Sequence, residues 1–161
     1  MNIFVAGATG VIGRELVRLL VERGDTVTGM TRTDSKRGML EQLGARPVVA
    51  DAFDAAAIGR AIAAAKPDVV IHQMTALNDL GASRNVDRAF AQTSRLRTEG
   101  TDILLAASRS AGVPRFIAQS YCGYLPVADG PRVVTEEEAL DPQDAGPLAG
   151  VVQSIAYLER A

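Results

Sequence analysis

The chain has 161 residues, of which 47% are apolar and 22% are charged. These values are typical of one globular domain with a substantial core, and they exclude an intrinsically disordered chain. Its 17 Lys and Arg against 19 Asp and Glu leave a net charge of −2. A dedicated nucleic-acid-binding protein would carry a basic excess, so no nucleic acid is expected as a partner.

The chain holds one cysteine, Cys122, and one histidine, His72. One cysteine excludes an intrachain disulfide, and the pair does not supply the ligands of a zinc site, so we expect no metal. The amino terminus has no basic segment before its apolar run, which argues against a secretory signal. Charges, Gly or Pro interrupt every apolar stretch before the roughly 20 residues of a membrane-spanning helix. We therefore expect a cytoplasmic protein that has no membrane partner.

Short β-type runs alternate with longer helical patterns along the whole chain. We predict strands at Asn2–Ala6, Thr26–Thr31, Arg46–Ala50, Asp68–His72 and Arg115–Gln119. The segments between them have helical periodicity, with helices expected at Val11–Arg23, Ser35–Leu43, Asp87–Ala111 and Leu148–Ala161. A further Ala-rich helix is expected between Asp54, its N-cap, and Lys66. The alternation predicts one α/β domain over residues 1–161: a doubly wound parallel sheet with helices on both faces, in three layers.

Two loops interrupt this pattern. The segment between Gln73 and Val86 is long and polar, and residues 120–147 are rich in Gly, Pro, Asp and Glu without a sustained period. Irregular segments of more than about 20 residues are usually functional.

Three glycines follow the first predicted strand and lead directly into the first helix, in Gly7-Ala8-Thr9-Gly10-Val11-Ile12-Gly13. Glycine suits a tight strand-to-helix turn, a close approach of a diphosphate to the backbone, and close packing of helix on strand. The helix N-terminus adds unpaired N–H groups and a partial positive charge. The motif predicts a Rossmann-like dinucleotide site, with the diphosphate held by Gly7, Thr9, Gly10, Ile12 and Gly13.

The end of the second strand discriminates between coenzymes, because an acidic residue there binds the ribose hydroxyls of NAD and a basic one binds the 2′-phosphate of NADP. Arg32 stands at this place, followed by Lys36 and Arg37. NADP is therefore the preferred coenzyme. NAD stays open, since Asp34 is also close.

Together with the glycine turn, other segments carry a family resemblance: Asp51-Ala52, His72-Gln73-Met74-Thr75, Glu99-Gly100-Thr101-Asp102-Ile103-Leu104-Leu105-Ala106-Ala107 and Ala111-Gly112-Val113-Pro114-Arg115-Phe116-Ile117. They resemble the atypical and extended short-chain dehydrogenase/reductase superfamily, specifically its NAD-dependent epimerase/dehydratase-like group. The resemblance implies that Asp51 and Ala52 border the adenine and that Met74 and Thr75 line the coenzyme ribose. His72 is expected to be a hydrogen-bonded residue near the coenzyme rather than a catalytic base.

The chain departs from that family at its catalytic pair. The family uses a Tyr and a Lys four residues later, whose charge lowers the phenol pKa for proton exchange with substrate. The only lysines here are Lys36 and Lys66, and no tyrosine has a lysine four positions on. When Ser154 to Glu159 is aligned with the family's Ser-Lys-x-x-x-Glu segment, Val151 takes the position of the tyrosine and Ile155 that of the lysine.

The family's fifth strand ends in a Ser-rich segment that binds substrate, and the match here is Ser120 with Tyr121 beside it. These two are the candidate catalytic residues. The expected function is an NAD(P)-dependent oxidoreductase or epimerase/dehydratase-like enzyme acting on a small carbonyl or sugar-like substrate. The alternative is a non-catalytic NADP(H)-binding sensor, regulator or partner subunit.

Extended members of the family continue past this last helix with a small C-terminal part that closes over the substrate. The 161 residues stop before that part. If they are the whole protein, selectivity would come from a partner subunit or a second copy of the chain, or the protein would have no substrate. If they are a portion of a longer protein, the remainder would supply the closing part.

Overall fold

A computed structural model describes residues 1–77, 86–121 and 148–161. The part of the predicted irregular segment at 122–147, with Cys122, lies outside the described residues. Within them the strands form one parallel sheet in the order β3-β2-β1-β4-β5. The strand bounds are β1 Asn2–Ala6, β2 Thr26–Thr31, β3 Arg46–Val49, β4 Val69–His72 and β5 Arg115–Ala118. The predicted α/β doubly wound architecture is confirmed.

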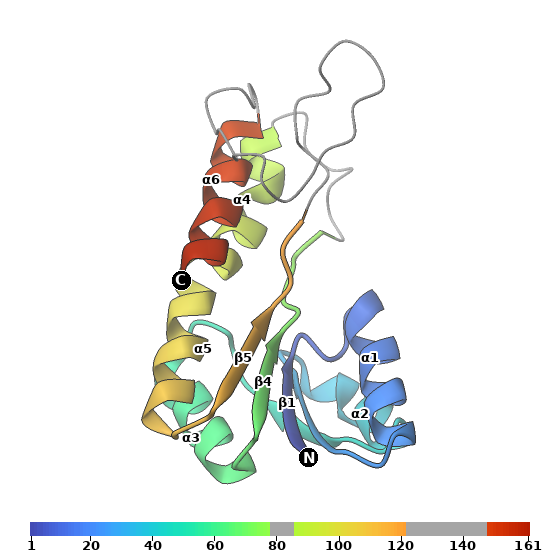
Figure 1. The fold of residues 1–161 in the computed structure, drawn as a ribbon. Coiled ribbons are helices and arrows are strands. Elements are labelled where there is room, and N and C mark those ends of the chain that lie inside the picture. Colours follow the sequence, from blue (N-terminus) through green and yellow to red (C-terminus); the bar gives the residue numbers. More distant parts are fainter. Residues whose placement is uncertain (78–85, 122–147) are drawn as a thin grey trace, which may run out of the picture.

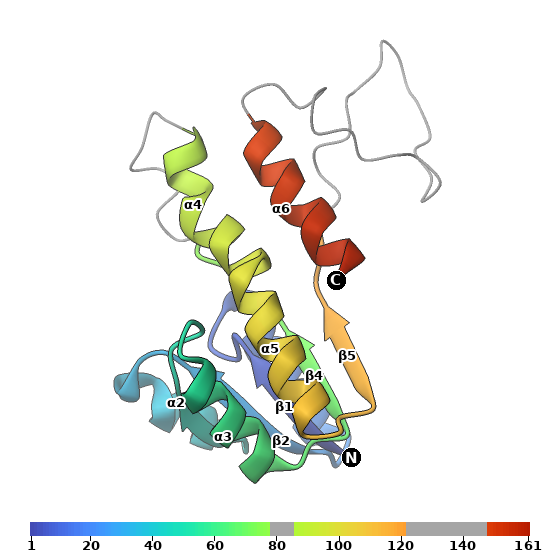
Figure 2. The ribbon, with the colours of Figure 1, turned by 90° about the vertical axis from the view of Figure 1, so that its left-hand side faces the viewer.

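Helices cover both faces of the sheet (Figures 1 and 2). One face carries α1 (Val11–Glu22) and α2 (Arg37–Gln42), and the other carries α3 (Ala55–Ala65) and α5 (Glu99–Ser110). The 3-10 helix η1 (Asp34–Lys36) precedes α2, so the predicted second helix begins as a tighter turn. At the upper end of the fold in Figure 1, α6 (Ala149–Arg160) packs along α4 (Val86–Arg97).

Two apolar clusters hold these layers together. Phe4, Ile58, Ile62, Val70 and Leu104 belong to the cluster under α3 and α5. The opposite cluster, under α1 and α2, is made by Ile3, Val5, Val17, Val27, Leu40 and their neighbours. Strand β4 is buried along its whole length, and β1 is buried after its first residue. Both faces of the central strands are therefore covered, as an all-parallel sheet requires.

The long helix predicted at Asp87–Ala111 is wrong in one respect, because it is divided into α4 and α5 at Thr98. Thr98 leaves the helical conformation, with φ −100° and ψ −87°. Its hydroxyl donates to the carbonyl oxygens of Ser94 and Arg95, at 3.1 and 3.3 Å. Such bonds from a side chain to the preceding turn compete with helix geometry and bend the chain.

The strand order reverses beside β1, which pairs with β2 on one side and β4 on the other. In open parallel sheets ligands bind outside the carboxyl ends of the strands at such a reversal. The fold therefore places the ends of β1, β2 and β4 around one candidate site.

Candidate functional site

The glycine turn is fixed at the reversal point by backbone hydrogen bonds to both neighbouring strands. The N–H of Ala8 donates to the carbonyl of Met30 at 3.2 Å, and the N–H of Gln73 donates to the carbonyl of Ala6 at 2.8 Å. Gly7 has φ +87°, a conformation that residues with a Cβ rarely adopt. The turn therefore lies between the ends of β2 and β4.

Neither Gly7 nor Gly13 has space for a side chain. A Cβ on Gly13 would lie 2.2 Å from the carbonyl oxygen of Gly7, and a Cβ on Gly7 would lie 2.6 Å from the carbonyl oxygen of Gln73. Gly10 is less restricted, since its Cβ would lie 3.3 Å from the Gly7 oxygen. The tight packing of helix on turn leaves a bare backbone surface for a ligand.

The N-termini of α1 and α3 differ in how they are capped. Asp54 caps α3, where its carboxylate accepts from the N–H of Ala57 at 2.9 Å. Gly10 caps α1 without a side chain, so the first N–H groups of α1 keep no side-chain partner among the described residues. An uncapped helix N-terminus attracts anions. This turn fits the diphosphate of a dinucleotide.

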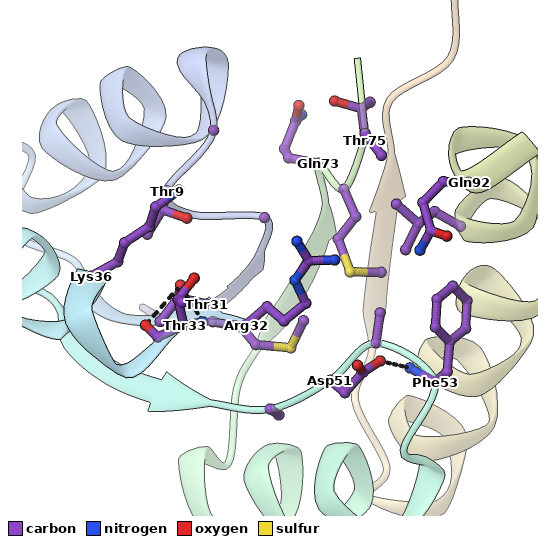
Figure 3. Close-up of a pocket in the computed structure, with 18 residues that line it drawn as sticks. Thr9, Thr31, Arg32, Thr33, Lys36, Asp51, Phe53, Gln73, Thr75 and Gln92 are labelled. Atoms are coloured by element: carbon purple, nitrogen blue, oxygen red, sulfur yellow. Dashed lines mark hydrogen bonds between the residues drawn. The ribbon is translucent and has the colours of Figure 1, made fainter. Parts of the chain in front are cut away.

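A cavity of about 220 Å³ opens beside this turn (Figure 3). It is bordered by the glycine turn, the end of β2, the segment after β3, the segment after β4, and α4. Its lining residues are Gly7, Thr9, Gly10, Met30, Thr31, Arg32, Thr33, Lys36, Ala50, Asp51, Ala52, Phe53, Gln73, Met74, Thr75, Ala76, Gln92 and Leu96.

Most predicted coenzyme residues line this cavity. Two do not: Gly13 is buried against Gly7, and the side chain of Ile12 is exposed. Gly13 can act only through the shape of the turn, and Ile12 only through its backbone. The predicted residues that line the cavity are Gly7, Thr9, Gly10, Arg32, Asp51, Ala52, Met74 and Thr75.

The charges after β2 separate into two groups. Arg32 and Lys36 line the cavity. Asp34 and Arg37 do not, and the Arg37 guanidinium lies 3.6 Å from the Asp34 carboxylate. The cationic group of the sequence therefore contributes two side chains to the cavity.

The wall of the cavity after β3 is built around Phe53. Asp51 accepts from the N–H of Phe53 at 2.8 Å, and the Arg95 guanidinium lies 3.7 Å from the centre of the Phe53 ring. Glu99 holds Arg95 with two bonds of 2.6 and 3.0 Å, and hydrogen bonding from Arg95 lowers the pKa of the Glu99 carboxyl. These contacts fix one face of the ring.

His72, at the end of β4, is buried and makes two hydrogen bonds. Its Nδ1 accepts from the N–H of Met74 at 3.1 Å, which leaves Nε2 to donate to the carbonyl of Leu96 at 3.2 Å. Burial lowers the pKa of the His72 imidazole. The predicted hydrogen bonding of His72 is confirmed, and its two partners, Met74 and Leu96, both line the cavity. Its nearness to the coenzyme stays a prediction.

Five polar or aromatic lining residues were not among the predicted site residues: Thr31, Thr33, Phe53, Gln73 and Gln92. Thr31 and Thr33 flank the predicted Arg32. Phe53 directly follows Asp51-Ala52, and Gln73 is part of the segment that carries the family resemblance, so both could have been found. Gln92 comes from α4, and nothing in its sequence context links it to the glycine turn.

Ser120 and Tyr121 lie just beyond β5 and do not line the cavity. The Ser120 hydroxyl donates to the carboxylate of Glu159 on α6, and Tyr121 is exposed. Their contact with a substrate stays a prediction.

Helix α6 buries the two residues that the predicted alignment sets against the family's Tyr and Lys. Val151 is 5% exposed and Ile155 is fully buried. Both are aliphatic, so neither can exchange a proton.

Among the helices of residues 1–77, 86–121 and 148–161, none is long and apolar enough to cross a membrane. The same ranges hold no group of three His, Cys, Asp or Glu side chains that could bind a metal ion.

Comparisons with known proteins agree with this geometry. The chain is 45% identical to a 3-diazoavenalumate denitrifying reductase from a Streptomyces species, over 99% of this chain and 51% of that protein. It is 29% identical to a 4-hydroxy-2-methyl-3-oxo-4-farnesyl-3,4-dihydroquinoline-1-oxide ketoreductase from Stigmatella aurantiaca, over 99% of this chain and 44% of the relative. The chain thus spans about half the length of these curated relatives.

In fold the chain is similar to the UDP-glucose 4-epimerase of Thermus thermophilus, solved with NAD. The TM-score is 0.77 at 24% identity, over 99% of this chain and 49% of that one. A family model described as NAD(P)H-binding matches residues 7–144. The chain therefore belongs to the NAD(P)H-binding family.

Proposed function

We propose that the protein binds NADP(H) in this cavity and uses it to reduce a small electrophilic substrate. The observation that carries the coenzyme preference is the pair of cations, Arg32 and Lys36, at the end of β2. In this fold the ribose of the adenosine half lies there, and a 2′-phosphate on it pairs with cations.

The acidic residues near this end of the cavity do not favour NAD. Asp34 is paired with Arg37 and does not line the cavity. Asp51 lines it, but one of its oxygens already accepts from the N–H of Phe53. Asp51 also follows β3, whereas the carboxylate that binds the ribose of NAD stands at the end of β2.

A binding experiment tests this preference. Arg32→Ala should weaken NADPH binding about 10- to 150-fold, the range of about 1.5–3 kcal/mol for hydrogen bonds to charged groups, and leave NADH nearly unchanged. Titration of coenzyme fluorescence measures both. Arg37→Ala is the matched control, because it removes a neighbouring cation that does not line the cavity. An equal loss of NADPH and NADH in Arg32→Ala would remove the reason for choosing NADP.

No tyrosine among these 161 residues is followed by a lysine four positions later, and this favours a substrate whose reduction needs no proton donor. A nicotinamide coenzyme supplies hydride, and a carbonyl that accepts hydride becomes an alkoxide that must take up a proton. An aromatic diazonium ion that accepts hydride does not need to take up a proton. Hydride forms the new C–H bond at the ring carbon, while the electron pair of the C–N bond leaves with N₂.

The substrate class we propose is therefore an aromatic diazo compound. The support is the Streptomyces relative, which is named for the reduction of a diazo compound, and the aliphatic Val151 and Ile155 of α6. A carbonyl substrate is the second candidate, favoured by the ketoreductase relative. It would need a proton donor, for which Ser120 and Tyr121 remain the candidates.

Deuterium transfer separates these candidates. With coenzyme deuterated at C4, the protein should convert an arenediazonium salt to the arene carrying one deuterium, with release of N₂, faster than a protein-free control. A panel of aldehydes and ketones should show little coenzyme oxidation. Carbonyl turnover that Tyr121→Phe or Ser120→Ala abolishes would overturn the diazo proposal in favour of the carbonyl one. Tight NADPH binding without turnover on either class would instead support a non-catalytic sensor or partner subunit.

A further inference from the structure

Gln73, which lines the cavity, carries a polar atom that the other described residues leave without a hydrogen bond. Its side-chain Oε1 is buried and has no hydrogen-bond partner among the described residues. A buried polar atom without a partner costs about as much free energy as a lost hydrogen bond, so such atoms are rare in folded proteins. Gln73 also lines the cavity, which makes a ligand the natural partner.

The position of Gln73 limits the part of a dinucleotide that it can reach. The backbone carbonyl oxygen of Gln73 lies 2.6 Å from where a Cβ of Gly7 would be, so the residue lies directly beside the glycine turn. Figure 3 shows the side chain near that of Thr75, at the end of the cavity away from Asp51 and Phe53. Beyond the diphosphate, this is the nicotinamide half of the coenzyme.

The chemistry of Oε1 restricts the partner further. A carboxamide oxygen only accepts hydrogen bonds, and a diphosphate has no proton to donate at neutral pH. The first donors beyond the diphosphate are the hydroxyl groups of the second ribose. We infer that Gln73 is a positioning residue, whose Oε1 accepts from a hydroxyl of the nicotinamide ribose and so orients the ring that delivers hydride. This inference rests on the proposed binding of NADP(H).

Three ligands that differ by one piece each test the assignment on the Gln73→Met variant, which keeps the length of the side chain and removes its polar end. NADPH and 2′-phospho-ADP-ribose both contain the second ribose, and each should bind about 3- to 10-fold more weakly. The third ligand, adenosine 2′-phosphate 5′-diphosphate (2′-phospho-ADP), keeps the diphosphate, lacks that ribose and should bind as before. Gln42→Met, a substitution of an exposed glutamine at the end of α2, is the matched control.

The variant should also be more stable without coenzyme. Removal of a buried unsatisfied atom should raise the melting temperature by about 2–4 °C, whereas a merely structural glutamine would lower it. Weaker ligand binding together with a higher melting temperature is therefore the expected signature.

Other outcomes overturn the inference in distinguishable ways. A loss for NADPH but not for 2′-phospho-ADP-ribose would assign the donor to the nicotinamide amide. Equal losses for all three ligands, or a lower melting temperature, would make Gln73 structural. If the unmodified protein binds neither NADPH nor 2′-phospho-ADP, the proposed function fails and the inference fails with it.

Discussion

The glycine turn and helix α6 differ in how closely their residues match the family's motifs. In the turn, Gly7 and Gly13 have no space for a side chain, and the N-terminus of α1 carries no side-chain cap. In α6, the two positions that the predicted alignment sets against the family's Tyr and Lys hold Val151 and Ile155, both buried. The comparison teaches that the turn that fits a diphosphate and the helix aligned with the catalytic pair are separate parts of this fold, so each can be tested by itself.

The largest expected effect comes from placing the family's lysine back into α6. Ile155→Lys should lower the free energy of unfolding by about 3–5 kcal/mol, because Ile155 is fully buried and taking a charge out of water at that position is costly. Urea unfolding measures the change. Gln153→Lys, on the exposed side of the same helix, is the control and should change stability by less than about 0.5 kcal/mol. Native stability in Ile155→Lys would mean that α6 still has room for a proton-transfer lysine.

The next largest expected effect comes from a substitution in the glycine turn. Gly13→Ala places a methyl group 2.2 Å from the Gly7 carbonyl oxygen, so the turn must shift. We expect a loss of about 1–3 kcal/mol in stability and a loss of coenzyme binding. Gly59→Ala is the control, since its Cβ meets nothing within 4 Å and α3 should gain about 0.5–1 kcal/mol. The account of the turn is wrong if Gly13→Ala binds NADPH as tightly as the native protein.

The smallest effect concerns His72, which links β4 to the cavity wall. Its folded pKa lies below the ordinary value of 6.5 because burial disfavours the charged ring. Below pH 6.5 the unfolded chain therefore binds the proton first, and stability falls as the pH decreases toward the folded pKa. The slope there is at most about 1.4 kcal/mol per pH unit.

His72 is the only histidine, so this slope should be absent from His72→Asn in the range just below pH 6.5. Urea unfolding at closely spaced pH values measures it. An unchanged slope in the variant would assign the titration to another group.

Much of the fold could be predicted because its signals are local. The periodicity of the strands, the glycine turn and the Asp54 cap each depend on neighbouring residues, and each is found at the predicted place. The break at Thr98 could not be predicted, because a threonine within an otherwise helical pattern signals a bend only once its hydroxyl bonds to the preceding turn.

The residues of the candidate site also divide into those that local sequence predicts and those that only the tertiary fold brings together. Arg32 and Asp51 follow directly from the strands that carry them. Gln92 and the Arg95–Phe53 contact bring α4 against the segment after β3, and only the tertiary fold creates that neighbourhood. Gln73 was visible in the sequence, but its importance lies in an unsatisfied atom that only coordinates reveal.

The central claim is that the glycine turn and the cations after β2 form a working NADPH site. Titration of the unmodified protein with NADPH and with NADH, followed by coenzyme fluorescence, tests it most directly. The account predicts saturable binding of both coenzymes, with NADPH at least about 10-fold tighter. Failure of both to bind, or tighter binding of NADH, would contradict it.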